Sequence, residues 1–168
     1  MQTLLEGYAI KFGDNIDTDA IIPARYCNSF RGEDLAPHVM AGVDSDFVAR
    51  RKHPTILIAG TNFGCGSARE NAPIALKAAG IIAIVAKSFS RTFFRNAINI
   101  ALPVFELAEI EEIRNNDFLQ IDPETSRIRN VSTEQEYSAV PFPDSVKQII
   151  RAGGLVEFTR ARLAEKRK

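Results

Sequence analysis

The chain has no tryptophan, only two cysteines and only two histidines among its 168 residues. Cys27 and Cys65 lack the Cys-x-x-Cys spacing of metal sites, and two thiols are too few to hold an iron–sulfur cluster. Lysine plus arginine and aspartate plus glutamate both number 21, so no net positive charge is available to attract nucleic acid. We therefore expect no metal site in this chain and no nucleic-acid partner.

Long hydrophobic runs are also missing. The two longest, Thr55–Ala59 and Ile81–Ala86, are far shorter than the roughly 20 apolar residues that cross a bilayer. The first residues show no cationic start followed by an apolar segment, so we expect no signal peptide. These features predict a cytoplasmic protein without a membrane partner, in a compartment that keeps both cysteines reduced.

What the chain does contain is typical of a globular protein, with 45% hydrophobic and 25% charged residues. Its length predicts one domain over residues 1–168. Within that domain we expect a motif-bearing core over residues 1–110, followed by small strands and C-terminal helices over residues 111–168.

The centre of the sequence gives the clearest pattern. Thr55–Ala59 and Ile81–Ala86 are apolar without alternation, as in strands covered on both faces. Between them, Ser67–Ala79 predicts a loop that leads into a helix. Ser90–Ile98 predicts a second helix and Leu102–Phe105 a third strand. This order predicts an α/β fold whose mixed sheet has a parallel βαβαβ core.

The two ends of the chain are expected to add smaller elements. Alternation over Tyr8–Phe12 predicts a strand, and Asp34–Met40 predicts a short helix with a proline in its first turn. The remainder predicts three short antiparallel strands, a short helix and a final amphipathic helix with a basic end: Phe118–Asp122, Arg127–Val131, Glu136–Val140, Ser145–Ala152 and Leu155–Lys168.

One segment, residues 60–73 (GTNFGCGSARENAP), indicates a binding site. A strand, a glycine-rich loop and a helix start present free amides to an anion, and Ser67 and Arg69 lie in that loop. Two structural alternatives are open: Ser67 as a helix N-cap, and Arg69 in an ion pair with Glu70 or Asp34. The loop lacks the lysine of a P-loop, the third glycine of a dinucleotide fingerprint and the Gly-x-Ser-x-Gly elbow of a hydrolase, which disfavours those three classes.

Residues 62–72 (NFGCGSARENA) resemble the signature loop of the aconitase-superfamily swivel domain, usually Asn-Phe-Gly-Cys-Gly-Ser-Ser-Arg-Glu-His-Ala. Three further stretches agree with that family in order and spacing, namely residues 13–26, 86–99 and 102–105. The resemblance implies a swivelling β/β/α domain. Within the superfamily, the chain is most similar to the small subunits of 3-isopropylmalate dehydratase.

The resemblance also implies a reaction and a partner. These subunits take part in removing and re-adding water on a hydroxy dicarboxylic acid, converting 2-isopropylmalate to 3-isopropylmalate in leucine biosynthesis. A separate large subunit carries the [4Fe-4S] cluster, so we expect activity only in the complex. Homoaconitate, citramalate or dimethylmalate as substrate, and a non-catalytic stabilising role, are the alternatives.

By resemblance, four residues receive roles around the signature loop. Ser67 aligns with the serine that acts as catalytic base, and Arg69 with a ligand of the substrate carboxylate. Gly66 lies beside Ser67 and would offer its backbone to substrate. Asp19 aligns with an active-site acid, although an N-cap or Asx-turn role is an alternative.

By the same resemblance, a second segment aligns with the loop that contacts the variable group of the substrate. It consists of Arg25, Tyr26, Cys27, Asn28 and Ser29. Cys27 stands where leucine is usual, and Asn28-Ser29 is neither the apolar nor the arginine version. We expect the loop to accept a small or moderately polar group. Two further departures, Ala68 for serine and Asn71 for histidine, are interpreted as tuning of the substrate.

Other reactive side chains fit structural roles better. Cys65, between two glycines, is expected to be a small buried thiol. Four polar residues flank the end of the second central strand, where open α/β sheets place ligands, but surface or interface positions are favoured for them: Lys87, Ser88, Arg91 and Arg95.

Overall fold

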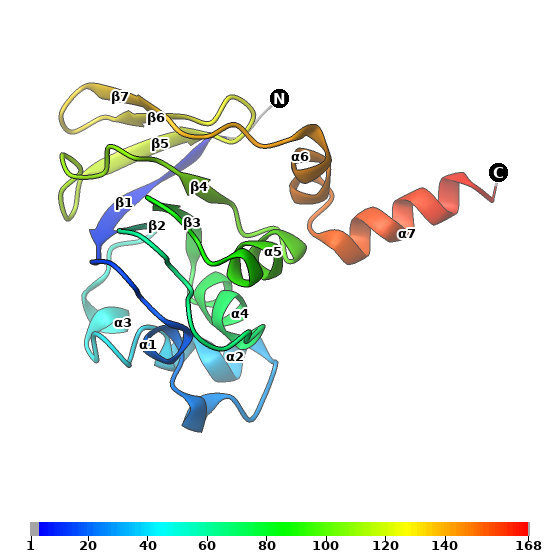
Figure 1. Ribbon diagram of the computed structural model, residues 1–168, viewed down its shortest axis with the longest axis horizontal. Coiled ribbons are helices and arrows are strands. Elements are labelled where there is room, and N and C mark those ends of the chain that lie inside the picture. The colour runs from blue at the N-terminus through cyan, green and yellow to red at the C-terminus, as the bar shows by residue number, and fades with distance from the viewer. Residues whose placement is uncertain (1–3, 168) are drawn as a thin grey trace.

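A seven-stranded mixed sheet organises residues 4–167, which the computed structural model describes (Figure 1). The strands lie in the order β4-β3-β2-β1-β5-β6-β7. Neighbours from β4 to β1 pair parallel, and neighbours from β1 to β7 pair antiparallel. The strands are β1 Leu5–Lys11, β2 Thr55–Ala59, β3 Ile81–Ala86, β4 Val104–Glu106, β5 Phe118–Asp122, β6 Arg127–Asn130 and β7 Gln135–Ser138.

The helices gather around the parallel end of the sheet, and the last helix points away from the body (Figure 1). They are α1 Thr18–Ile21, α2 Gly32–Leu35, α3 Phe47–Arg50, α4 Asn71–Ala78, α5 Arg91–Asn99, α6 Asp144–Arg151 and α7 Leu155–Glu165. Two short 3₁₀ segments, Ala24–Tyr26 and Ala36–His38, complete the described part of the chain.

The predicted parallel core is confirmed. β2 and β3 have the predicted bounds, and all of β2 and most of β3 are buried. The helix after β2 ends as predicted, because Gly80 adopts a φ of +83° and its amide bonds the carbonyl of Lys77. Ser90 caps α5 by accepting a hydrogen bond from the amide of Phe93. The fold is therefore mixed α/β.

In the antiparallel half of the sheet only one face is buried. Along β6, Ile128 and Asn130 are buried whereas Arg127 and Arg129 are exposed, as expected for a sheet with one solvated face. β7 ends at Ser138, earlier than predicted. The chain turns away there because the amide of Val140 bonds the carbonyl of Glu106 at the edge strand β4, over 2.8 Å.

Two predicted helices differ in the structure. Instead of one helix over residues 34–40, α2 begins at Gly32 and gives way to a 3₁₀ turn, because Pro37 cannot continue the amide ladder. α7 buries no side chain, and Arg162 lies on the same face as Leu155, Phe158 and Leu163. Apolar and charged side chains are therefore not separated, and the predicted amphipathic character is wrong. Within residues 4–167, no helix has the length and apolarity needed to cross a membrane.

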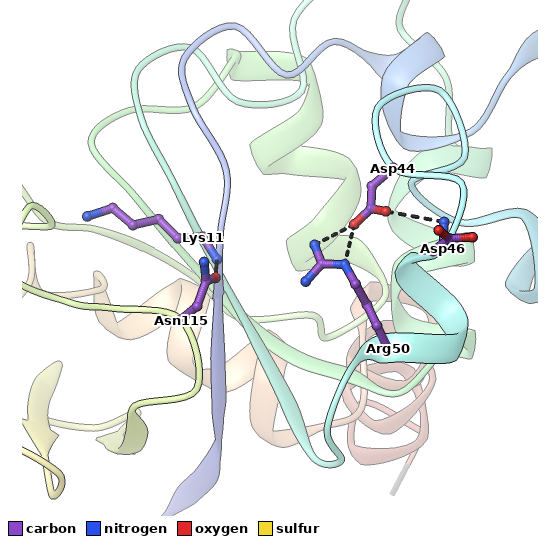
Figure 2. Close-up of polar contacts among 5 residues, drawn as sticks. All are labelled: Lys11, Asp44, Asp46, Arg50 and Asn115. Atoms are coloured by element: carbon purple, nitrogen blue, oxygen red, sulfur yellow. Dashed lines mark hydrogen bonds and ion pairs between the residues drawn. The ribbon is translucent and has the colours of Figure 1, made fainter.

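Hydrogen bonds and an ion pair hold two loops beside the parallel strands (Figure 2). At the end of β1 the amide of Lys11 donates to Asn115 Oδ1 over 2.8 Å. Near α3, Arg50 Nε donates to Asp44 Oδ2 over 2.7 Å, and the amide of Asp46 donates to Asp44 Oδ1 over 3.2 Å. Asp44 thus holds the turn that leads into α3.

Candidate functional site

The glycine-rich loop after β2 lies against the segment that precedes α1. The amide of Gly64 donates to the carbonyl of Ile16 over 2.7 Å, and the amide of Thr18 donates to the carbonyl of Cys65 over 2.9 Å. Gly64 has a φ of +78°, and a Cβ there would lie 2.2 Å from Phe93 Cγ. Only glycine fits this position, and the tight packing brings two loops from the carboxyl ends of β1 and β2 together.

Ser67 is exposed at the outer part of this loop. α4 begins four residues later, at Asn71, so the alternative of Ser67 as its N-cap is wrong. The N-terminus of α4 therefore lies beyond Arg69 and not directly at Ser67. Among the residues that the structure describes, no group hydrogen-bonds Ser67 Oγ, which leaves this hydroxyl open to solvent.

Arg69 forms an ion pair with Asp19, with 2.5 Å between Nη1 and Oδ1. The hydrogen bond that Arg69 donates to the Asp19 carboxylate, followed by a smaller influence of Cys27, raises the pKa of Arg69 above its ordinary value. The Arg69 side chain is 23% exposed and that of Asp19 63% exposed. The expected alternatives for Arg69, pairs with Glu70 or Asp34, do not form in the described chain.

Asp17, not Asp19, caps α1. Its Oδ1 accepts a hydrogen bond from the amide of Ala20 over 2.7 Å, and Asp19 lies in the first turn of the helix. The N-cap alternative for Asp19 is therefore wrong, and its carboxylate faces Arg69 instead. The run Asp-Thr-Asp therefore contains one acid that caps α1 and one that pairs with Arg69.

Gly42, which the sequence analysis missed, forms part of the support of Asp19. Its amide donates to the carbonyl of Ala20 over 3.1 Å, and a Cβ at this position would lie 2.3 Å from the carbonyl oxygen of Asp19. Only glycine, which has no side chain, allows the segment around residue 42 to approach α1 this closely. In the sequence, the only indication of this close approach was a single glycine between Ala41 and Val43.

Asp19 and Arg25 border the same shallow hollow, which has a volume of about 510 Å³. The 3₁₀ segment that follows Pro23 carries Arg25 to the rim of this hollow. The Arg25 guanidinium lies 4.6 Å from the centre of the Tyr26 ring, which stacks on His38 at 3.7 Å. The structure therefore brings one end of the predicted substrate loop beside the Asp19–Arg69 pair.

Cys27 and Cys65 are both free and half-buried. The Cys27 thiol faces the carbonyls of Ile22 and Pro23, at 3.8 and 3.7 Å, and lies close enough to Arg69 to influence its pKa. Cys65 is less buried than expected. No group of three or more potential ligands gathers within residues 4–167, so the donor set of this chain does not fit an iron–sulfur cluster.

Ser29 uses its side chain within the loop. Its hydroxyl donates to Asp34 Oδ2 over 2.7 Å and accepts from the amide of Arg31 over 3.0 Å. The carbonyl of Ser29 accepts from Asn71 Nδ2 over 2.7 Å. Asn28 Nδ2 faces the carbonyl of Arg25 at 3.4 Å. The polar groups of this loop are thus largely satisfied by neighbouring protein atoms.

The residues after β3 divide between two roles. Ser88 supports the signature loop, because its hydroxyl accepts from the amide of Asn62 over 2.8 Å. Lys87 forms an ion pair with Glu111, whose hydrogen bond raises the pKa of Lys87. Arg91 and Arg95 lie apart from the Asp19–Arg69 pair, at a separate cavity of about 290 Å³ beside β4.

Comparison with known proteins gives consistent matches. The family model for the aconitase C-terminal domain matches residues 32–109. The 3-isopropylmalate dehydratase small subunit of Thermodesulfovibrio yellowstonii is 52% identical over 95% of this chain and 96% of its own. That of Aquifex aeolicus is 47% identical over 99% and 100%. The crystal structure of 3-isopropylmalate dehydratase from Methanocaldococcus jannaschii superposes with a TM-score of 0.92 and 39% identity, over 99% of this chain and 100% of that one.

Proposed function

This chain belongs to the family of 3-isopropylmalate dehydratase small subunits, and from that premise we propose that it supplies the proton-transfer and carboxylate-binding groups of the dehydratase. The reaction is the conversion of 2-isopropylmalate to 3-isopropylmalate by loss and re-addition of water, in leucine biosynthesis. The partner is the large subunit of the complex. The observation that carries the proposal is the Asp19–Arg69 pair, with the exposed Ser67 two residues before Arg69 in the same loop.

Ser67 is the proposed base. As an alkoxide it takes the proton from the carbon next to a substrate carboxylate, the electron pair of that bond forms the carbon–carbon double bond, and hydroxide leaves from the adjacent carbon. The reverse steps add water with the hydroxyl on the other carbon. Because an ordinary serine is a weak base, the neighbouring guanidinium of Arg69 and the loop amides around Gly66 must stabilise its anion.

Arg69 is the proposed carboxylate ligand. Its raised pKa keeps it charged throughout the physiological range, and its planar fork suits a carboxylate. Asp19 holds that fork in place before substrate arrives. Since the Asp19 side chain is 63% exposed, a substrate carboxylate can share or take over its contact with Arg69 without leaving a buried carboxylate unpaired.

The segment Arg25–Ser29 is the proposed contact for the variable group of the substrate. The sequence left that group open because Asn28 and Ser29 are polar. With the Ser29 hydroxyl bonded to Asp34 and Arg31, the loop offers fewer free polar groups than its sequence indicates. This favours the apolar isopropyl group over the extra carboxylate of homoaconitate.

We assign the [4Fe-4S] cluster to the large subunit, because this chain offers only two separated thiols. We further treat residues 1–168 as one swivel domain and place the protein in the cytoplasm, where free thiols persist.

The test is an anaerobic turnover assay that follows the ultraviolet absorbance of the unsaturated acid. It compares this chain alone, its reconstituted cognate large subunit alone, and the mixture. Activity is expected only in the mixture, and Ser67→Ala should lower kcat by about a thousandfold. Ser145→Ala, an exposed serine on α6, serves as the matched control and should leave kcat unchanged.

Two results would contradict the proposal. An inactive mixture with an intact cluster and a stable complex would remove the assigned reaction. A Ser67→Ala mixture as active as the wild type would instead favour the alternative of a stabilising subunit that takes no part in the chemistry.

A further inference from the structure

We propose that Asn71 is a positioning residue. Its hydrogen bond to the carbonyl of Ser29, called the latch below, holds the Arg25–Ser29 loop at the start of α4 and thereby sets how strictly the site selects the variable group of its substrate. The selection part rests on the proposed function. The latch itself is a property of this chain alone.

The geometry of Asn71 is unusual for a helix start. The residue is only 5% exposed, and its Nδ2 donates over 2.7 Å to the carbonyl of Ser29. A polar side chain at a helix start ordinarily accepts a hydrogen bond from the amides of its own first turn. Here the side-chain amide of Asn71 instead donates its hydrogen bond outside the helix, to a residue 42 positions earlier in the chain.

The loop has few other ties of this kind. The bonds made by Asn28 and by the Ser29 hydroxyl stay within residues 25–34 and lie at exposed side chains. They fix the internal shape of the loop but do not anchor it to the signature loop. The bond from Asn71 is a part-buried hydrogen bond between the two loops, and buried hydrogen bonds are the more costly ones to lose.

The latch connects the Arg25–Ser29 loop to the residues around Arg69. Asn71 lies two residues after Arg69, and Cys27, in the same loop as Ser29, lies beside the Arg69 guanidinium. A shift of the Ser29 carbonyl therefore moves the loop relative to the proposed carboxylate ligand. The latch fixes the distance between the group that binds the common carboxylate and the loop that contacts the variable group.

The experiment compares three variants in the mixed complex. Asn71→Leu keeps the approximate shape and removes the donor, Asn71→His restores an N–H donor at the position, and Asn99→Leu makes the same chemical change at an exposed site on α5. Steady-state kcat and KM are measured with 3-isopropylmalate and with the analogue that carries a methyl group in place of isopropyl. Hydrogen–deuterium exchange is measured on the isolated chain.

For Asn71→Leu we expect KM for 3-isopropylmalate to rise about tenfold with kcat nearly unchanged, as for a lost hydrogen bond of ordinary strength. The ratio of kcat/KM between the two substrates should fall by a similar factor. Exchange should accelerate over residues 25–31 while β2 and β3 keep their protection. Asn71→His should recover most of both effects, and Asn99→Leu should show neither.

Unchanged exchange over residues 25–31 in Asn71→Leu would overturn the latch. Faster exchange there with unchanged substrate discrimination would overturn its role in selection, as would Asn71→His behaving like Asn71→Leu. Failure of the proposed function appears differently, as a wild-type mixture inactive on both substrates. In that case the exchange measurement still decides whether the latch exists.

Discussion

The two halves of the sheet differ in what they carry. Every residue proposed for the site follows β1 or β2, in loops at the carboxyl ends of parallel strands, whereas β5, β6 and β7 carry none. Parallel strands need crossover connections, and these deliver loops and helix starts to one edge. The antiparallel strands are joined by short turns, which leave no chain for a site. In this molecule the direction of the strands decides where the proposed site lies.

The largest expected effect concerns burial. Leu57 and Ile58 are neighbours on β2, point to opposite faces and are both fully buried, so Leu57→Ala and Ile58→Ala should each lower the free energy of unfolding by about 3 kcal/mol. On β6, Ile128→Ala should cost a similar amount and Arg129→Ala less than about 0.5 kcal/mol. Urea unfolding of the four variants checks this. If Leu57→Ala or Ile58→Ala were neutral, β2 would not be covered on both faces.

The second prediction compares two arginines. Arg69 belongs to the proposed site, and Arg129 lies exposed on β6. Arg69→Ala should lower kcat/KM of the complex on the order of a hundredfold, as for the loss of a charge-assisted contact to substrate. Arg129→Ala should leave it within about twofold. A comparable loss in Arg129→Ala would mean that the antiparallel half also takes part in the reaction.

The third prediction separates the two acids at α1. Asp17→Ala removes the helix cap and should lower the free energy of unfolding by about 1 kcal/mol. Asp19→Ala should leave unfolding nearly unchanged, because the carboxylate is exposed, and should raise KM. Denaturation and steady-state kinetics on both variants check the division. Equal effects of the two substitutions on stability would contradict the assignment of Asp17 as the cap.

The sequence predicted the central strands well because their evidence is local. β2 and β3 are continuous apolar runs between turn residues, and such runs are buried whatever surrounds them. For the helix after β2 the sequence predicted a loop that leads into a helix over Ser67–Ala79, without fixing the first helical residue. Pro73, tolerated only in a first turn, was the signal that places the helix start near Asn71.

The residues of the candidate site could be proposed from the sequence, but the contacts between them could not. The resemblance named Ser67, Arg69 and Asp19, yet the partner of Arg69 and the capping role of Asp17 depend on how two loops pack. The bond between Asn71 and Ser29 joins residues 42 positions apart. No local pattern encodes such a contact, because it exists only once α4 and the Arg25–Ser29 loop are brought together by the fold.

The smallest expected effect concerns α7, the element least like the parallel half. None of its side chains is buried, and Leu155, Val156 and Leu163 are exposed. A chain that stops after Gly154 should therefore lose less than about 1 kcal/mol of unfolding free energy, far below the loss for one buried residue of β2. Circular dichroism and urea unfolding of the shortened chain check this. The first turn of α7 lies beside α4 and α5, and an isolated helix of this length is marginal in water. A loss of several kcal/mol would therefore mean that α7 packs against the body beyond that first turn.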